Sequence, residues 1–144
     1  MTVITTFHER QREKRWKFER VVLRKLSLPT VQRSIRQYFQ PVLSFEVFTH
    51  PYLTDQCLDI AVEAYLLGAE YSRFGYFGEK MESVLARCNC ELTSLYEQLE
   101  GYFLLWLNDD NDRSTYEVIV GQFIYHWWQK GYEEGSKRYR LRLQ

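Results

Sequence analysis

Basic side chains gather in two short segments near the two ends of the 144-residue chain. Guanidinium and ammonium groups clustered in this way bind phosphates with strong salt dependence and little sequence preference, and nearby aromatic rings can stack on bases. An anionic membrane surface would engage the same groups. The candidate contacts to a partner or a nucleic acid are Arg10, Arg12, Lys14, Arg15, Trp16, Lys17, Arg138, Tyr139, Arg140 and Arg142. The same two segments also contain Arg20, Arg24, Lys25 and Lys137.

The charge of the chain is unevenly distributed, although 19 basic and 19 acidic residues give a formal net charge of zero. Residues 1–40 hold 10 basic and 3 acidic residues, a net charge of +7. Residues 41–112 hold 3 basic and 13 acidic residues (−10), and residues 113–144 hold 6 basic and 3 acidic residues (+3). This distribution excludes a uniformly basic nucleic-acid coat protein, but it allows a local basic surface.

Asp59, Glu63 and Glu70 form an acidic stripe on a predicted helix over residues 54–74. At about 100° per residue, the three side chains fall within about 40° of one another. The stripe is a ready partner for Arg20 and Arg24 within the fold. Internal neutralisation of the basic segments is therefore the alternative to their binding an external anion.

Residues 74–78 form a predicted aromatic turn between two helices, because glycine tolerates a positive φ angle. The three rings in this turn cannot all be buried by the helices that flank it, so another helix or a partner should cover them. The candidate interaction turn consists of Phe74, Gly75, Tyr76, Phe77 and Gly78.

The patterns expected of metal sites are not present. A di-iron site in a helical bundle needs Glu-x-x-His pairs, and His8, His50 and His126 do not follow that spacing. Cys88 and Cys90 are two apart on a predicted helix and point about 200° from each other, so they cannot close on one ion. The aspartates of residues 108–114 lack the glycine and glutamate positions of a calcium-binding EF-hand loop. We assign no metal ligand and no cofactor.

Catalytic signatures are equally weak. There is no Gly-x-Ser-x-Gly motif, Walker loop or dinucleotide fingerprint. Glu63 and Glu79 could form a pair of acid and base carboxylates, but the acidic stripe and a helix start account for them equally well. We assign no catalytic residue, and an enzyme or metal protein with an unrecognised site is the third alternative.

The cysteines and the hydropathy pattern indicate a cytoplasmic protein. Cys57, Cys88 and Cys90 are odd in number and do not form the framework of a secreted, disulfide-bonded domain. No apolar run approaches the roughly 18–20 residues that span a bilayer, and the first 20 residues do not follow the order of a secretory signal. We therefore expect no disulfide and no transmembrane segment.

The apolar periodicity is helical and predicts five helices. They cover residues 6–26, with Thr6 as the cap, 29–40 between two prolines, 54–74 with Thr54 as the cap, 79–107 and 115–132. Residues 41–53 are irregular or briefly extended, with His50 held in an extended conformation by Pro51. Residues 108–114 form a loop. Residues 133–144 form a basic tail, whose alternation of arginines with Tyr139, Leu141 and Leu143 suits an extended segment.

These elements indicate an all-α protein with a single compact domain over residues 1–144. The predicted third and fifth helices are apolar on most sides and should be central. Residues 8–15 are charged nearly all round, so the first helix should project over residues 1–17 and dock through Phe18, Val21, Val22 and Leu26.

The stretch LDIAVEAYLLGAEYSRFGYFGEKME at residues 58–82, the pair Trp127-Trp128 and the ending KRYRLRLQ resemble a small family of uncharacterised Bacillus-type proteins, the YbaK-like domain of unknown function. The resemblance covers most of the chain and is most specific at EAYLLG and FGYFGE. It implies a cytoplasmic protein of endospore-forming bacteria without an assigned activity, and it supplies no catalytic residue.

The leading hypothesis is a non-enzymatic cytoplasmic protein-interaction or regulatory module, acting as a homodimer or with another protein. Its binding surfaces would be the projecting basic helix and the turn at residues 74–78. The runner-up is a nucleic-acid-associated regulator that uses residues 10–25 and 137–142.

Overall fold

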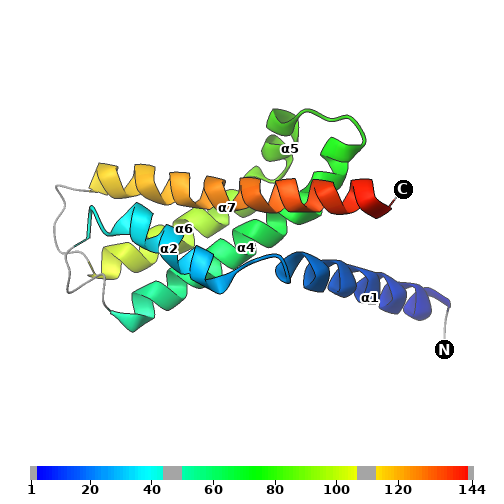
Figure 1. Cartoon of the computed structure of the whole chain (residues 1–144), viewed down its shortest axis with the longest axis horizontal. Coiled ribbons are helices and arrows are strands. Elements are labelled where there is room, and N and C mark those ends of the chain that lie inside the picture. The colour runs from blue at the N-terminus through cyan, green and yellow to red at the C-terminus, as the bar shows by residue number, and fades with distance from the viewer. Residues whose placement is uncertain (1–2, 44–49, 107–112, 143–144) are drawn as a thin grey trace.

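The computed structural model describes residues 3–43, 50–106 and 113–142, which form six helices and no strand (Figure 1). The helices are α1 (Val3–Leu23), α2 (Leu28–Phe39), α4 (Pro51–Tyr76), α5 (Met81–Arg87), α6 (Asn89–Trp106) and α7 (Arg113–Arg142). The predicted all-α class and single compact domain are confirmed, with one more helix than expected.

The parallel helices α4 and α7 form the centre of the fold, as predicted for the third and fifth helices (Figure 1). Their backbones touch at glycines. A Cβ atom on Gly68 would overlap the carbonyl oxygen of Trp128, and one on Gly131 would overlap the carbonyl oxygen of Tyr65. A Cβ atom on Gly135 would likewise crowd the carbonyl oxygen of Ala69 and the hydroxyl of Ser72 on α4. Small residues therefore let two long helices approach more closely than side chains would permit.

Aromatic side chains fill much of the core between α2, α6 and α7. The ring centroids of Phe39 and Phe103 are 5.0 Å apart, and those of Phe39 and Phe123 are also 5.0 Å apart. All three side chains are fully buried. The indole N–H of buried Trp127 donates a hydrogen bond of 3.1 Å to Ser34 Oγ on α2, so its polar atom is satisfied.

The described contacts of α1 with the bundle lie in its second half, and the helix leads away from the bundle toward the N-terminus (Figure 1). Val22 has no exposed surface, and Tyr65 Oη donates a hydrogen bond of 3.2 Å to the Val22 carbonyl oxygen. Phe18 contacts Tyr139 of α7, with ring centroids 5.5 Å apart. The predicted cap at Thr6 is wrong, because α1 already begins at Val3.

Two other predicted caps lie inside helices. α4 begins at Pro51 rather than after Thr54, because proline is well suited to the first helical position and His50 precedes it with an extended conformation (φ −70°, ψ 119°). The extended conformation of His50 was predicted correctly. α7 begins at Arg113 rather than at Thr115, so the end of the predicted loop at 108–114 is helical. The predicted loop residues 108–112 lie outside the described part of the chain.

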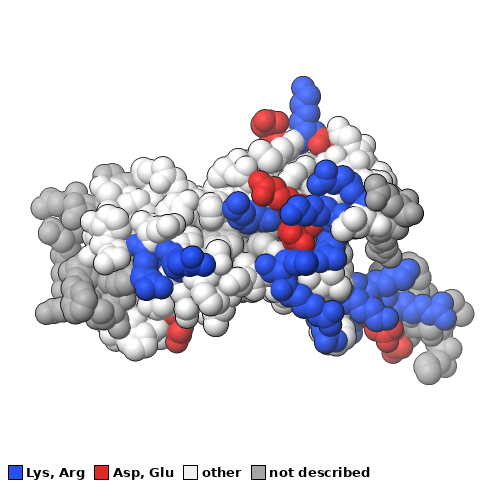
Figure 2. Space-filling model, viewed as in Figure 1, with Lys and Arg blue, Asp and Glu red and all other residues white. Residues whose placement is uncertain are grey.

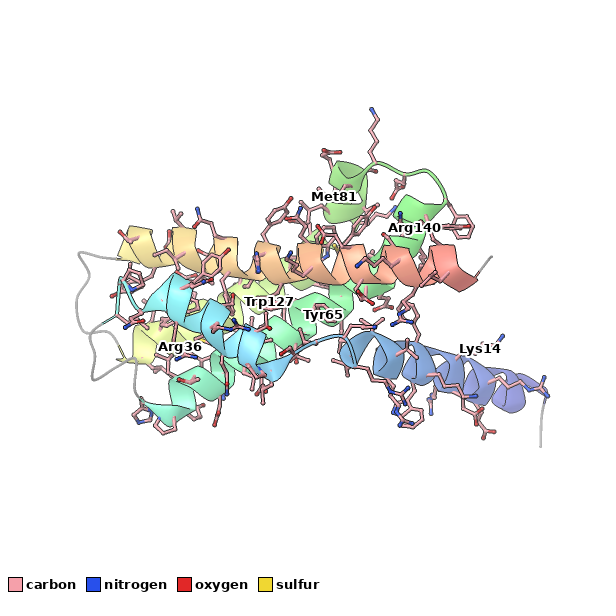
Figure 3. The ribbon with its side chains drawn as sticks, in the orientation of Figure 1. Lys14, Arg36, Tyr65, Met81, Trp127 and Arg140 are labelled. Carbon is pink, nitrogen blue, oxygen red and sulfur yellow. The ribbon has the colours of Figure 1, made fainter. Side chains whose placement is uncertain are left out.

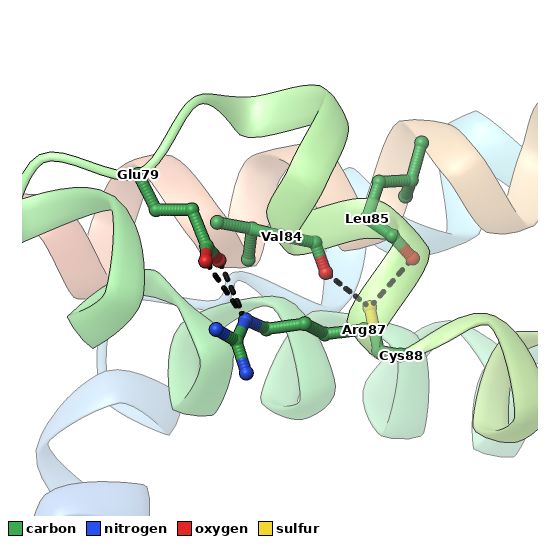
Figure 4. A network of polar contacts seen from close by, with 5 residues as sticks. All are labelled: Glu79, Val84, Leu85, Arg87 and Cys88. Atoms are coloured by element: carbon green, nitrogen blue, oxygen red, sulfur yellow. Dashed lines mark hydrogen bonds and ion pairs between the residues drawn. The ribbon is translucent and has the colours of Figure 1, made fainter.

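The predicted continuous helix over residues 79–107 is wrong, because the helix is interrupted at Cys88, between α5 and α6. Cys88 has φ −100° and ψ 18°, and its carbonyl oxygen accepts the Leu92 N–H at 2.9 Å as α6 begins. Its thiol is placed 3.5 Å from the carbonyl oxygens of Val84 and Leu85 (Figure 4). Val84 and Cys88 form a small buried cluster with Trp128, so the break lets α5 pack on α7.

An ion pair connects the turn after α4 to the end of α5 (Figure 4). Arg87 Nε donates to Glu79 Oε1 and Oε2 at 2.9 and 2.7 Å, and this hydrogen bond lowers the pKa of the Glu79 carboxyl. The Arg87 guanidinium carbon also lies 4.5 Å from the centroid of the Phe74 ring. Gly78 supplies the positive φ of 104° that the turn requires.

The predicted extended tail over residues 133–144 is wrong, because α7 continues as a helix to Arg142. Gly135 packs against α4, and Arg138 Nε lies 3.4 Å from Glu134 Oε1 at the helical i,i+4 spacing. Tyr139 is held between rings of two other helices. These contacts stabilise the helical conformation, although the alternating sequence pattern suits an extended segment.

Candidate functional site

The two basic segments and the aromatic residues at the end of α4 meet at one end of the molecule. Tyr139 of α7 contacts Phe18 of α1 at 5.5 Å and stacks on Tyr76 of α4 at 6.0 Å between ring centroids. Tyr76 in turn contacts Phe77 at 5.4 Å. Three helices that are distant in the sequence are therefore joined by a row of four aromatic rings.

We call this region the basic end, because Lys and Arg side chains gather there over α1 and the C-terminal part of α7 (Figure 2). Lys14 on α1 and Arg140 on α7 lie at this end of the molecule, whereas Arg36 on α2 lies toward the other (Figure 3). The described basic side chains of the basic end are Arg10, Arg12, Lys14, Lys17, Lys137, Arg138 and Arg140.

A groove of about 390 Å³ runs between α1 and α7 in the basic end. Its lining combines three cationic and three apolar side chains. Leu141 is 63% exposed, while Phe18 and Val21 are partly buried. The residues that line this α1/α7 groove are Lys14, Lys17, Phe18, Val21, Arg138 and Leu141.

A second, open cavity of about 650 Å³ lies beside the groove, where the end of α4 meets α7. Lys137 and Arg140 contribute positive charge to its lining, and Glu133 contributes a negative charge. Tyr76 and Tyr132 supply its aromatic surface. The basic segment of α7 thus borders two depressions.

The aromatic turn differs from the prediction, because Phe74, Gly75 and Tyr76 belong to the last turn of α4. Phe74 is partly buried, with the guanidinium carbons of Arg73 and Arg87 at 4.9 and 4.5 Å from its ring centroid. Phe77 follows the helix and is 78% exposed, and Gly78 is also exposed. Of the three rings, only that of Phe77 is largely open to solvent.

The candidate contact residues differ in their access to a partner. Arg10, Arg12, Lys14, Lys17 and Arg140 are exposed, whereas Arg138 is partly buried and pairs with Glu134. The side chains of Arg15 and Arg142 lie outside the described part of the structure.

The two aromatic candidates also differ. Tyr139 is partly buried between Phe18 and Tyr76, so it is not an open stacking platform. Trp16 is 56% exposed, and the Arg20 guanidinium carbon lies 4.5 Å from its ring centroid. Trp16 therefore keeps an accessible aromatic surface that Tyr139 lacks.

The acidic stripe lies on the outer side of α4. Asp59 and Glu63 are exposed and Glu70 is partly buried. At about 100° per residue, the stripe is on the side of α4 opposite to Gly68, which contacts α7. The one member of the basic end with a described ion pair, Arg138, pairs with Glu134 of its own helix rather than with the stripe.

Burial shifts the pKa values of several titratable groups outside the basic end. No group of three or more His, Cys, Asp or Glu side chains that could hold a metal occurs among the described residues. Burial raises the pKa of the Cys57 thiol to about 12 and that of the Cys88 thiol to about 11. Both thiols are protonated at neutral pH and are therefore poor nucleophiles. Burial and the nearby Lys130 lower the pKa of His126.

Cys57, Cys88 and Cys90 are free cysteines. Within the described ranges, none of the helices combines the length and the apolar character needed to cross a bilayer.

Sequence reasoning found the charges of the site but not its groove. Val21 and Phe18 were assigned only to the docking face of α1, and Leu141 to an extended tail. The spacing of Glu134, Arg138 and Leu141 at four and three residues is helical, and this signal would have placed Leu141 on the same side of a helix as Arg138.

Comparisons with known proteins extend over the whole chain. A family model described as "Protein of unknown function (DUF2521)" matches residues 1–144. The chain is 31% identical over 146 residues to the "Uncharacterized protein YbaK" of Bacillus subtilis (strain 168), and the match covers 99% of each chain. No solved structure matches.

Proposed function

Because the chain belongs to the DUF2521 family of proteins of unknown function, we propose its role from its own surfaces. The protein is a non-enzymatic interaction module that binds an anionic partner through the basic end. This proposal keeps the leading hypothesis of a binding protein and specifies the charge of the partner.

One observation carries the proposal: basic segments from opposite ends of the chain lie side by side. α1 contributes exposed Arg10, Lys14 and Lys17, and α7 contributes exposed Lys137 and Arg140. The contact between Phe18 and Tyr139 fixes the two helices relative to each other. Clustered cations of this kind attract a partner with several negative charges and speed its association.

We also propose that the protein is located in the cytoplasm. Cys57, Cys88 and Cys90 are free thiols, as expected of a reducing compartment. A homodimer or an acidic protein partner is compatible with this role.

A nucleic acid is the second candidate partner, and exposed Trp16 is the observation that favours it. The ring is 56% exposed on a basic helix, where it can stack on an unpaired base. Such binding would make the protein a nucleic-acid-associated regulator.

Binding to immobilised heparin, a flexible polyanion, tests the proposed function. We expect the full chain to bind at low salt and the triple variant Arg10→Glu, Lys14→Glu, Lys17→Glu to elute at much lower salt. By analogy with nucleic acids, removing three cationic contacts should reduce the slope of log K against log salt by roughly 2–3.

The matched control is Arg33→Glu with Arg36→Glu, which reverses two exposed charges on α2 outside the basic end. This variant should elute close to the wild type. A wild-type chain that passes through the column at low salt, or two variants with equal losses, would contradict the proposal. Circular dichroism spectra confirm that each variant is folded.

A further inference from the structure

We propose that the anionic partner of the basic end is a lipid surface, with the apolar lining residues of the α1/α7 groove contacting the apolar part of the membrane interface. This inference rests on the proposed function and names the partner. Attraction between charges does not account for the apolar side chains that line the α1/α7 groove.

The groove places aliphatic surface among cations. Leu141 is 63% exposed in the last turn of α7, and Phe18 and Val21 line the same groove. The other lining residues are the cations Lys14, Lys17 and Arg138. Phosphate groups use the cations but gain nothing from aliphatic carbon, and nucleic-acid bases stack on flat rings rather than on Leu or Val. A bilayer interface satisfies both parts, since its anionic headgroups lie directly above acyl chains.

Other exposed apolar side chains lie near the groove. Phe77 is 78% exposed beyond α4, next to Tyr76 in the row of rings that ends at Phe18. Trp16 is 56% exposed on α1. Trp and Phe beside Lys and Arg are the composition of segments that rest in the interface of a membrane.

Base stacking has less support at this site. Tyr139, the aromatic residue between two arginines of α7, is enclosed by Phe18 and Tyr76. One face of Trp16 is already occupied by the Arg20 guanidinium. A nucleic acid would therefore rely mainly on phosphate contacts and would leave Leu141 in water.

The charge distribution also fits a planar anionic partner. At about 100° per residue, Lys137 and Arg140 lie on the side of α7 that faces away from α4, and both are exposed. Asp59 and Glu63 lie on the side of α4 that faces away from α7. One orientation therefore brings Lys137 and Arg140 to the bilayer and keeps Asp59 and Glu63 away from it, with Glu133 as a single carboxylate among the cations.

Co-sedimentation of the full chain with lipid vesicles tests the inference. We expect binding to vesicles of phosphatidylcholine with one-third phosphatidylglycerol and none to phosphatidylcholine alone. Each cation near an anionic surface contributes about fivefold in affinity, so Lys14→Glu with Lys17→Glu should weaken binding by more than about 25-fold.

Leu141→Asn separates the apolar contact from the charges. It should weaken vesicle binding by about three- to tenfold, the effect of losing part of a leucine's burial, and leave heparin binding unchanged. Leu105→Asn is the matched control, because Leu105 is 77% exposed at the end of α6, outside the basic end. This control should bind vesicles as the wild type does.

The outcomes distinguish the inference from the proposed function. Binding to heparin but not to the anionic vesicles overturns the lipid inference and leaves the proposed function intact, whereas failure with both overturns both. Tighter binding to duplex or single-stranded DNA than to the vesicles assigns the site to nucleic acid and also overturns the inference. Equal vesicle binding by Leu141→Asn and the wild type overturns the role of the groove.

Discussion

Three glycines determine how closely α4 and α7 approach each other. A Cβ atom on Gly68, Gly131 or Gly135 would meet backbone atoms of the other helix, and backbone atoms cannot rotate away as a side chain can. Ordinary helix propensity disfavours glycine by about 1 kcal/mol. Glycine at these positions therefore lowers the intrinsic stability of the helix but allows the close contact between α4 and α7.

Replacing Gly131 by alanine should destabilise the protein by about 1–3 kcal/mol, the usual cost of overpacking. The added methyl group would overlap the Tyr65 carbonyl oxygen. Urea unfolding followed by circular dichroism measures the change. Gly101→Ala on α6 is the control, because a Cβ there meets no atom within 4 Å. It should stabilise the protein by about 0.5–1 kcal/mol, and a Gly131→Ala variant as stable as the wild type would disprove the close contact.

Single residues could be predicted from the sequence where periodicity decides their position. Val22 was placed on the docking face of the first helix and has no exposed surface. The role of Gly131 and Gly135 was not predicted, because hydrophobic periodicity carries no signal for a residue without a side chain. Gly135 also fell within the segment that was interpreted as a tail.

Helices were predicted well where their ends are set by local chemistry. α2 lies at Leu28–Phe39, as Pro29 and Pro41 indicated. The break at Cys88 and the last turns of α7 could not be predicted in this way. They depend on contacts with Trp128 and with Phe18 and Tyr76, which are distant in the sequence. Propensity is a weak prior when such tertiary contacts compete with it.

The contact between Phe18 and Tyr139 helps to hold α1 against the bundle. Phe18→Ala removes the ring contact with Tyr139, so α1 should open more often while the rest of the bundle stays folded. Hydrogen exchange followed by mass spectrometry should show faster exchange in peptides of α1 and unchanged exchange in α4.

Trp16→Ala is the control for α1, because this exposed ring packs on Arg20 of its own helix rather than on the bundle. It should leave the exchange of residues 18–23 close to that of the wild type. Equal protection of α1 in the wild type and in Phe18→Ala would contradict a role of the Phe18 ring in holding the helix.

At the scale of the whole molecule, one apolar cluster connects helices from both ends of the chain. It includes Val22 of α1, Ile35 of α2, Leu99 of α6 and Phe123 of α7, together with much of α4. The smaller cluster around Val84 shares Leu67 and Leu92 with the larger one. The core is therefore continuous across the described helices.

Such a core should unfold in one cooperative step. Trp127 and Trp128 are buried in the two clusters, so tryptophan fluorescence reports tertiary packing while circular dichroism reports helices. The two signals should follow the same urea curve. The exposed-charge variant Lys14→Glu with Lys17→Glu should also give a single transition. A fluorescence change that precedes the loss of helix would show that the clusters unfold separately.

The arrangement of the candidate site could be predicted only in part. The two basic segments were found because charge is visible in the sequence. Their meeting depends on α7 remaining helical to its last turns, which brings Tyr139 between Phe18 and Tyr76. An extended tail would have left Arg140 and Leu141 without a fixed relation to Lys14 and Lys17.

The parallel course of α4 and α7 has an electrostatic consequence for the basic end. Both helices end there, at Tyr76 and Arg142, and the aligned peptide dipoles of a helix place about half a negative charge at its C-terminus. Lys137, Arg138 and Arg140 lie in the last turns of α7, where this backbone field stabilises them. The two helix termini therefore cancel about one unit of positive charge, and the potential that reaches a partner is smaller than the side chains alone would produce.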